Sequence, residues 1–504
     1  MAMSSAKSLV SASIWGIVSK IISSAAKFIT IPMLVAYYGK ADYGLIALAF
    51  SLNAYLRLMD MGLNIGAIRF FSNWLANGQT EKIKSISQSS IVFYGVIGII
   101  NAILFVIMAN NTEFFFNLKE SQIEVYQVML YILAASAIFS WTSNVVSQIL
   151  SAYGQVGWLN KVTIISSVFD FVCAFLAIKL NLSLSYYFFF YTISTLIIIP
   201  LNILKLRKYL KDVLSYLLPI WNGKAFREIL SYSLTLFVMG IFQFSADNLR
   251  PLLIGKLSSD GISALTDYRV IQTISSIVMM FGAVFTQVLL PHMSKLNPQN
   301  DKLKIEELVY NSTKYISIFI SFMVFILIAN AQTLLILYMG KDYIQLTVWL
   351  VIWLLTLLGM HSSPVSSLIL SSGKTKPVAI MAAISCIISL SIVAFLAPKF
   401  SVGAAVIGYL IYNIMQNCFN YFYYVPYVLK LNGRKIFWKS FAPTVMIGLF
   451  SCGVVSIFNY LVHFKNSFST FFIDSIIFTI VFILSIFLLI KKEEIIELKK
   501  IVFK

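Results

Sequence analysis

Fourteen long apolar segments follow one another along this chain, and no other feature restricts the fold as strongly. Each is longer than 20 residues, and about 20 apolar residues in a helix cross the hydrocarbon core of a bilayer. Barrel strands would instead alternate apolar and polar residues over about ten positions. We therefore predict an all-α integral membrane protein with about 14 transmembrane helices. The predicted helices are 9–36, 42–71, 86–109, 124–150, 157–178, 183–205, 226–254, 262–290, 308–333, 343–370, 376–397, 402–428, 437–461 and 468–490.

The composition excludes the main soluble classes. Of 504 residues, 59% are hydrophobic and only 12% are charged, whereas soluble domains carry about 25% charged residues. That leaves too little charge to cover a soluble surface, so a soluble enzyme, a disordered protein and a disulfide scaffold are excluded. All four cysteines lie in apolar segments, so we expect no disulfide, no metal and no cofactor. The net charge of +18 arises mainly between the apolar segments, which indicates membrane topology rather than nucleic-acid binding.

The distribution of basic residues predicts the orientation in the membrane. With the N-terminus inside, the inner links and tails contain 26 lysines and arginines and the outer links contain 7. Inner loops of membrane proteins carry such an excess of positive charge. If one helix were miscounted, every later link would be assigned to the opposite side of the membrane, and the excess of basic residues on the inner side would disappear. We therefore expect an even number of helices, with both termini in the cytoplasm.

Two short stretches recur at nearly the same offset and suggest an internal duplication. Residues 147–151 (SQILS) resemble 367–371 (SLILS) at an offset of 220, and Pro32-Met33-Leu34 resembles Pro251-Leu252-Leu253 at an offset of 219. Six helices separate the copies, so the two halves have the same orientation, and a substrate path is expected at the interface of such parallel repeats. The predicted domains are a six-helix bundle at 1–212, a second at 213–430, and an added helix pair with a cytoplasmic tail at 431–504.

Five cations lie inside predicted helices rather than in links. A lysine or arginine at the middle of the bilayer costs at least about 2.5–3.5 kcal/mol on insertion scales, so several together predict a hydrated cavity or counter-charges. Their neighbours recur at helical spacing, which places polar side chains on one face of each helix. We expect these faces to line a shared cavity between the two bundles. The predicted lining residues are Lys20, Lys27, Asn53, Arg57, Asp60, Asn64, Gln243, Asp247, Arg250, Arg269 and Gln272.

Some of these charges also have a structural interpretation. Arg57 and Asp60 are three residues apart and can neutralise one another, as can Asp247 and Arg250. Arg250 also lies near enough to a helix end to extend its charge to the membrane surface. Asp170 is an isolated acid, either a site for a coupling proton or Na⁺ or a structural partner inside the bundle.

A net positive cavity suits an anionic ligand. Phosphate and diphosphate groups accept hydrogen bonds from guanidinium and ammonium groups, so Lys20, Lys27, Arg57 and Arg269 are the predicted diphosphate-binding residues. Polar faces at 143–148 and 413–420 fit either sugar binding or hydrogen bonds between helices.

Several motifs resemble bacterial polysaccharide flippases. They are Gly39-Lys40-Ala41-Asp42-Tyr43-Gly44-Leu45, Leu58-Met59-Asp60-Met61-Gly62-Leu63, Arg69-Phe70, Leu253-Ile254-Gly255-Lys256, Tyr268 and Pro291-His292-Met293-Ser294-Lys295. Such flippases include the O-antigen (Wzx-type) translocases of the multidrug/oligosaccharidyl-lipid/polysaccharide (MOP) exporter superfamily. The resemblance extends over the whole chain, including two six-helix halves and an extra helix pair, a MOP/MATE-like fold.

The resemblance implies a function. Such flippases move undecaprenyl-diphosphate-linked oligosaccharides from the cytoplasmic to the periplasmic leaflet of the bacterial inner membrane, alongside a polysaccharide polymerase and a chain-length regulator. In the related peptidoglycan-precursor flippases, cations of the first, second and eighth helices engage the diphosphate. The corresponding helices here carry Lys20, Lys27, Arg57 and Arg269, with lysines where the relatives have arginines in the first helix. The resemblance also implies alternating access, with coupling to H⁺ or Na⁺ left open.

Two other functions compete with this one. A multidrug or organic-cation antiporter of the same superfamily would need an excess of carboxylates in the cavity, whereas five cations here meet four candidate acids. A membrane polymerase or ligase acting on the same lipid would need catalytic residues in a large outer loop. The longest outer link, 110–123, contains no histidine or arginine, so we do not expect an enzyme.

Overall fold

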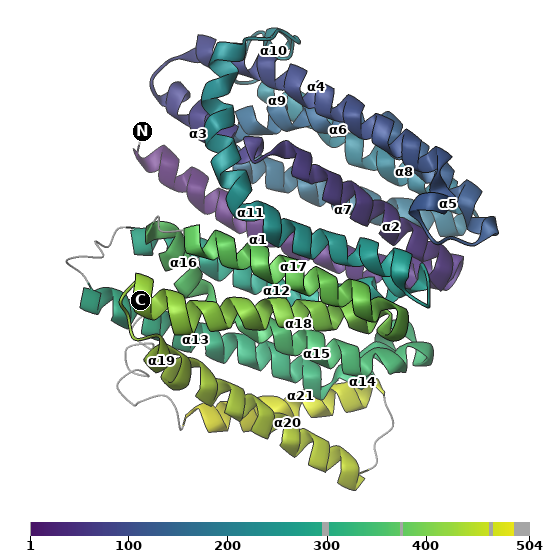
Figure 1. Ribbon diagram of the computed structural model, residues 1–504, viewed down its shortest axis with the longest axis vertical. Helices are drawn as coiled ribbons and strands as arrows, with labels where there is room; N and C mark the ends of the chain where they lie inside the picture. The colour runs from purple at the N-terminus through teal and green to yellow at the C-terminus, as the bar shows by residue number, and fades with distance from the viewer. Residues whose placement is uncertain (1, 295–301, 373–375, 463–466, 488–504) are drawn as a thin grey trace. The chain divides into compact units, whose positions relative to one another are not determined.

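In the computed structural model, residues 2–294, 302–372, 376–462 and 467–487 are described, and their regular structure is entirely helical (Figure 1). Short 3-10 or π segments, labelled η, interrupt or extend several helices. The elements are α1 (Ala2–Tyr38), α2 (Lys40–Leu56), η1 (Arg57–Asp60), α3 (Leu63–Ala76), α4 (Thr80–Asn110), α5 (Thr112–Phe115), α6 (Glu120–Ala152), α7 (Val156–Lys179), α8 (Leu184–Leu196), α9 (Ile198–Leu206), α10 (Val213–Tyr216), α11 (Gly223–Leu257), α12 (Ser263–Ser294), α13 (Lys302–Ala329), α14 (Ala331–Met339), η2 (Lys341–Leu346), α15 (Thr347–Leu357), η3 (Leu358–Ser362), α16 (Ser363–Ser372), α17 (Lys376–Phe400), α18 (Val402–Phe419), η4 (Asn420–Val428), α19 (Gly433–Ile436), η5 (Phe437–Phe441), α20 (Ala442–Val462) and α21 (Phe468–Ile486).

The prediction of an all-α membrane protein is confirmed. Every predicted span falls on one helix or on a run of consecutive helical elements. Within the described residues, eleven of these spans are long and apolar enough to cross a membrane. The predicted spans 42–71, 226–254 and 262–290 are helical but are not among the eleven, and each contains at least two charged residues.

The predicted continuous helix at 42–71 is wrong in one respect, because it is broken in the middle. Met61 (φ 51°) and Gly62 (φ 70°) adopt left-handed backbone conformations between η1 and α3. Glycine tolerates this region, and two such residues in succession end an α-helix. The Asp60 carboxylate then accepts a hydrogen bond from the backbone N–H of Asn64, 3.1 Å away, in the first turn of α3.

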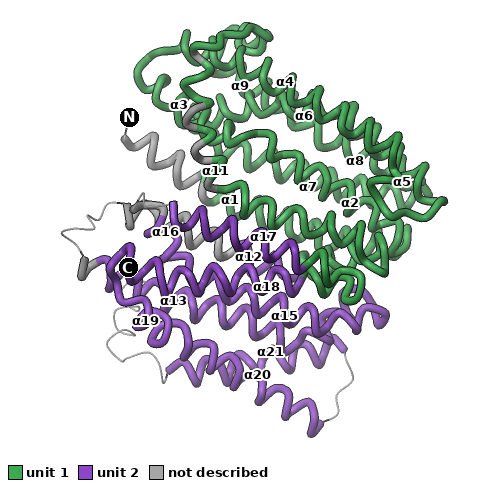
Figure 2. The backbone as a smooth tube through the Cα atoms, viewed as in Figure 1, with its two compact units in different colours: residues 1–273, 393–405 green, residues 274–392, 406–504 purple. Residues whose placement is uncertain are grey.

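The described chain forms two compact units, shown in Figure 2. Unit 1 contains residues 1–273 and 393–405, and unit 2 contains residues 274–392 and 406–504. Every predicted site residue belongs to unit 1. The predicted domain limits at residues 212 and 430 follow from the sequence repeat and remain a prediction. The predicted cytoplasmic tail beyond residue 487 lies outside the described residues.

In unit 1, the long helices α4 and α6 run side by side, as do α1 and α7 (Figure 1). Gly98 makes the first of these contacts close, because a Cβ atom there would lie 2.7 Å from Cα of Ile138 in α6. Small residues allow helix backbones to approach one another in membranes, where packing rather than hydrophobicity drives association. The core beside this contact contains buried side chains of α3, α4 and α6, among them Phe71, Tyr94 and Val145.

In unit 2, α13 packs against α20, α15 and α21. The polar face predicted at 413–420 makes internal hydrogen bonds here. Asn413 Nδ2 donates to the backbone oxygen of Tyr409 at 2.9 Å, and Gln416 Nε2 donates to Ser385 Oγ of α17 at 3.2 Å. These contacts favour the packing interpretation of this face over the sugar-binding one.

Candidate functional site

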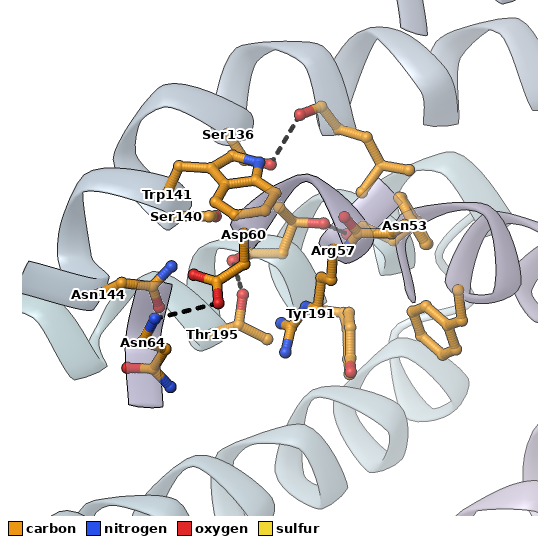
Figure 3. A pocket seen from close by; sticks show the side chains of 14 residues that line it. Asn53, Arg57, Asp60, Asn64, Ser136, Ser140, Trp141, Asn144, Tyr191 and Thr195 are labelled. Atoms are coloured by element: carbon orange, nitrogen blue, oxygen red, sulfur yellow. Dashed lines mark hydrogen bonds between the residues drawn. The ribbon is translucent and has the colours of Figure 1, made fainter. Parts of the chain in front are cut away.

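A polar pocket of about 340 Å³ lies within unit 1, enclosed by α2, η1, α3, α6 and α8 (Figure 3). The helix break described above borders it, and irregular backbone inside a membrane is tolerated where it lines such a cavity. Four polar residues of the predicted span at 42–71 all line this pocket, namely Asn53, Arg57, Asp60 and Asn64. The lining residues are Phe50, Asn53, Arg57, Asp60, Asn64, Leu133, Ser136, Ser140, Trp141, Asn144, Phe188, Tyr191, Thr192 and Thr195.

Arg57 is the only cation lining this pocket, and its side chain is exposed. Within the described part of the chain, its guanidinium makes no hydrogen bond and no ion pair; in Figure 3 it lies beside the ring of Tyr191. Among the described residues, Asp60 forms no ion pair with Arg57. Its carboxylate accepts hydrogen bonds from Tyr94 and from the backbone of Asn64, and its charge interacts with that of Arg57 without direct contact. A guanidinium has five donors to satisfy, so the pocket presents an unused anion-binding group.

Asp60 belongs to a hydrogen-bonded chain that links three helical segments. The hydroxyl of Tyr94 in α4 donates to Asp60 Oδ1 at 2.6 Å, and Gln148 Nε2 of α6 donates to that same hydroxyl at 2.8 Å. Tyr94 and Gln148 are both fully buried. Trp141 stacks on Tyr94 with ring centroids 5.9 Å apart. The chain holds the broken helix, and with it Arg57, against the packed core of unit 1.

We predict that Tyr94→Phe destabilises the protein. The change removes the hydroxyl and leaves the Gln148 amide without its buried acceptor, and orphaned buried polar groups cost about 1–3 kcal/mol. Thermal unfolding in detergent measures the effect as a lower melting temperature. Tyr131→Phe is the matched control, since its hydroxyl bonds Asn110 at an exposed position. An equal loss in the two variants would contradict a structural role for the buried chain.

A second group of charges lies close to this pocket. The charge of Lys27 in α1 interacts with those of Asp170 in α7 and Arg269 in α12. The charges of Asp170, Arg57 and Arg269 all act on Tyr191, which lines the pocket. Two of the four predicted diphosphate-binding cations, Arg57 and Arg269, therefore act on one pocket-lining tyrosine, and a third, Lys27, interacts with Arg269.

Arg269 and Lys27 differ in how many protein groups bind their side chains. Arg269 donates to Gln272 Oε1 at 2.6 Å and to Ser51 Oγ of α2 at 2.9 Å. Lys27 is exposed and has no hydrogen bond or ion pair with a described residue. Arg269 is thus a fixed charge, whereas Lys27, like Arg57, retains its donors for a ligand.

The carboxylate next to Arg269 in the sequence does not neutralise it. Asp267 is 5% exposed and pairs instead with Lys40, whose Nζ lies 2.8 Å from the carboxylate. Lys40 is the first residue of α2, so this ion pair fastens α2 to the start of α12. Residues two positions apart in a helix point in different directions, so Asp267 and Arg269 do not face one another.

Other predicted site residues lie apart from the pocket lining. Arg250 is 1% exposed and donates from Nη1 to Asp247 Oδ1 at 3.1 Å, the structural pair that their spacing allows. Gln243 is exposed on α11. Lys20 is half-buried on α1 and is not among the charges that interact with Lys27.

Asp170 has one hydrogen-bond partner in the described chain. Its Oδ1 accepts from Ser194 Oγ of α8 at 2.8 Å, and its charge interacts with that of Lys27. It therefore links α7, α8 and α1, and this arrangement is compatible with both interpretations that the sequence left open.

The polar face predicted at 143–148 contributes Asn144 to the pocket, but sequence analysis missed the other lining residues of α6 and all those of α8. Ser136, Ser140 and Asn144 follow one another at intervals of four residues in α6, and Tyr191 and Thr195 do so in α8. That spacing places each set on one helix face. It was a usable signal, but hydroxyl groups are common in apolar helices and no charge marks these positions.

Solved structures with the same fold are membrane transporters. The chain matches a structure described as the lipid II flippase MurJ in an inward closed conformation, with 14% identity over 94% of this chain and 98% of that chain and a TM-score of 0.72. It matches an inward-facing multidrug resistance MATE family transporter of the MOP superfamily with 12% identity, over 88% of this chain and 99% of that chain, and a TM-score of 0.63. A MOP superfamily transporter from Pyrococcus furiosus matches with 12% identity, over 89% of this chain and 96% of that one, at a TM-score of 0.57. The chain therefore has the MATE/MurJ-like fold.

Sequence comparison identifies the family. A model of the family described as polysaccharide biosynthesis protein matches residues 9–297, more than half of the chain. The chain belongs to the polysaccharide biosynthesis protein family. This confirms the resemblance seen in the sequence motifs, and the fold is one that solved membrane transporters share. No curated protein matches significantly.

Proposed function

We propose that this protein is a flippase for an undecaprenyl-diphosphate-linked oligosaccharide, such as an O-antigen or other surface polysaccharide repeat unit. It would move this lipid from the cytoplasmic to the periplasmic leaflet of the bacterial inner membrane. Membership of a polysaccharide biosynthesis family supports the substrate class. The observation that carries the proposal is the unpaired guanidinium of Arg57 in a polar pocket of unit 1.

The charges around the pocket fit a diphosphate better than a cation. Arg57 and Lys27 keep free donors, and Arg269 adds a fixed positive charge that acts on the same Tyr191. Of the nearby acids, Asp267 is paired with Lys40, whereas Asp60 lines the pocket and accepts hydrogen bonds only from uncharged donors. An anionic head group gains charge-assisted hydrogen bonds from Arg57 and Lys27, whereas these two cations repel an organic cation.

In the proposed cycle, the diphosphate binds first at Arg57 and Lys27 while the glycan occupies the hydrated space beside them. Hydroxyl and amide groups of the lining, such as Ser140 and Asn144, supply hydrogen bonds to sugars. Alternating access then exposes the head group to the other side. Pro32 and Pro251, which lie inside α1 and α11, are positions where these helices can bend.

The test is transport by the purified protein in liposomes. The probe is a polyprenyl-diphosphate oligosaccharide with a fluorescent label on its sugar, and dithionite added outside quenches only label in the outer leaflet. The protein is expected to make the inner-leaflet label accessible to dithionite within minutes, while liposomes without protein protect it. Unchanged protection of this lipid, combined with transport of the organic cation rhodamine 6G, would instead establish the antiporter.

The same assay tests ion coupling. An imposed H⁺ or Na⁺ gradient is expected to accelerate transport by the wild-type protein and not by Asp170→Asn if Asp170 binds the coupling ion. Equal acceleration of both proteins would leave Asp170 its structural role as the acceptor for Ser194.

A further inference from the structure

A second cavity lies on the other side of the pocket wall. It is a groove of about 390 Å³ between α6 and α8, lined mainly by apolar side chains. Several of these are widely exposed, including Phe139 (60%) and Ile193 (47%). In a membrane protein, an exposed apolar groove on the outside of a bundle faces the hydrocarbon of the lipid.

Two small residues line both cavities. Ser136 of α6 and Thr192 of α8 belong to the polar pocket and also to the apolar groove. Each hydroxyl donates to its own helix, Ser136 to the backbone oxygen of Leu133 at 3.0 Å and Thr192 to that of Phe188 at 2.8 Å. Both residues are buried where α6 and α8 meet, and no hydrogen bond between described residues joins the two helices at these positions, so the helices can separate here without breaking one.

We propose that the seam between α6 and α8 binds the polyprenyl chain of the lipid whose diphosphate lies at Arg57. The chain occupies the apolar groove and passes between Ser136 and Thr192. This inference rests on the proposed function and adds the place where the substrate's tail stays. One amphiphilic ligand then occupies both cavities. Its anionic end lies beside the guanidinium of Arg57, and its apolar end contacts the lipid.

Charge and shape favour this occupant over an ordinary phospholipid. The groove provides no hydrophobic driving force, because lipid tails surround it already, so selectivity comes from the head group at Arg57. Polyprenyl diphosphates carry a single chain next to the diphosphate, whereas a glycerophospholipid carries two chains joined at the glycerol. A single chain requires a smaller separation of α6 and α8 at Ser136 and Thr192 than two joined chains would.

Photocrosslinking of the full-length protein in liposomes tests the location. The probe is a polyprenyl diphosphate with a diazirine in the isoprene units next to the diphosphate. We expect labelling of residues 128–139 and 189–196 to exceed that of the equally exposed lipid-facing residues 96–107 of α4 severalfold. Excess unlabelled polyprenyl diphosphate is expected to abolish the difference, while phosphatidylglycerol leaves it intact. Arg57→Ala is expected to reduce labelling at the seam alone.

Uniform labelling of all lipid-facing helices, or displacement by phosphatidylglycerol, would overturn the inference. A second variant tests the passage itself: Thr192→Trp fills it and is expected to slow lipid transport at least severalfold. Ile103→Trp, on the exposed face of α4, is the control for adding an indole to the lipid-facing surface. If the seam is labelled but the protein does not transport the lipid, the binding site is retained and the flippase function is rejected. If Thr192→Trp transports normally and labelling is uniform, only the binding site at the seam is rejected.

Discussion

Replacing Arg57 by alanine is expected to reduce transport of a polyprenyl-diphosphate oligosaccharide by about tenfold to a hundredfold, because hydrogen bonds to charged groups contribute about 1.5–3 kcal/mol. Among the described residues, Arg57 is the only cation that lines the pocket, and its guanidinium makes no hydrogen bond or ion pair with them. Its removal should therefore cost substrate binding without disturbing a protein contact. The liposome assay gives the rate, and the melting temperature shows whether the fold is intact.

Two comparisons make this prediction specific. Arg57→Lys keeps the charge but loses the planar pair of donors that binds phosphate oxygens, so an intermediate rate is expected. Arg207→Ala removes an exposed arginine near the end of α9, outside the pocket, and is expected to transport normally. A wild-type rate for Arg57→Ala would eliminate the diphosphate role of this side chain.

Replacing Gly98 by leucine is expected to cause the largest loss of stability. A Cβ atom at this position would lie 2.7 Å from the backbone of Ile138, so α4 and α6 must move apart. Overpacking of this kind costs about 1–3 kcal/mol or more, and these two helices carry Tyr94 and Gln148 of the buried chain. We expect a melting temperature lower by several degrees and reduced transport.

The same helix offers a matched control. Gly95 lies one turn earlier in α4, and a Cβ atom there would meet nothing within 4 Å. Gly95→Leu therefore changes composition and helix propensity equally while leaving the contact with α6 intact. Equal melting temperatures for the two variants would show that the close approach at Gly98 contributes nothing to stability.

Most of the fold could be predicted from the sequence, because span length and hydropathy are local properties. The predicted span at 402–428 coincides with α18 and η4, and the span at 468–490 begins at the first residue of α21. The break at Met61 and Gly62 was missed. It depends on capping of α3 by Asp60 and on the adjacent pocket, and neither shows in an apolar run.

The candidate site was predicted only in part, and its contacts were not predicted. Helical spacing placed Asn53, Arg57, Asp60 and Asn64 together, and they line one pocket. Spacing could not show that Asp60 is bonded to Tyr94, 34 residues away, and so leaves Arg57 unpaired. Likewise, Asp267 forms its ion pair with Lys40, which is far away in the sequence, and not with Arg269, which is two residues away.

The sequence alone determined that this chain crosses the membrane many times as helices and carries several cations inside its spans, since both follow from how residues partition between water and lipid. Only the tertiary structure decided which of those cations remain free. Arg250 and Arg269 are held by protein groups, whereas Arg57 is not. The local spacing allowed the bonds of Arg250 to Asp247 and of Arg269 to Gln272, but the bond between Asp60 and Tyr94 depends on helices that meet across a long separation in the chain, which no local pattern encodes.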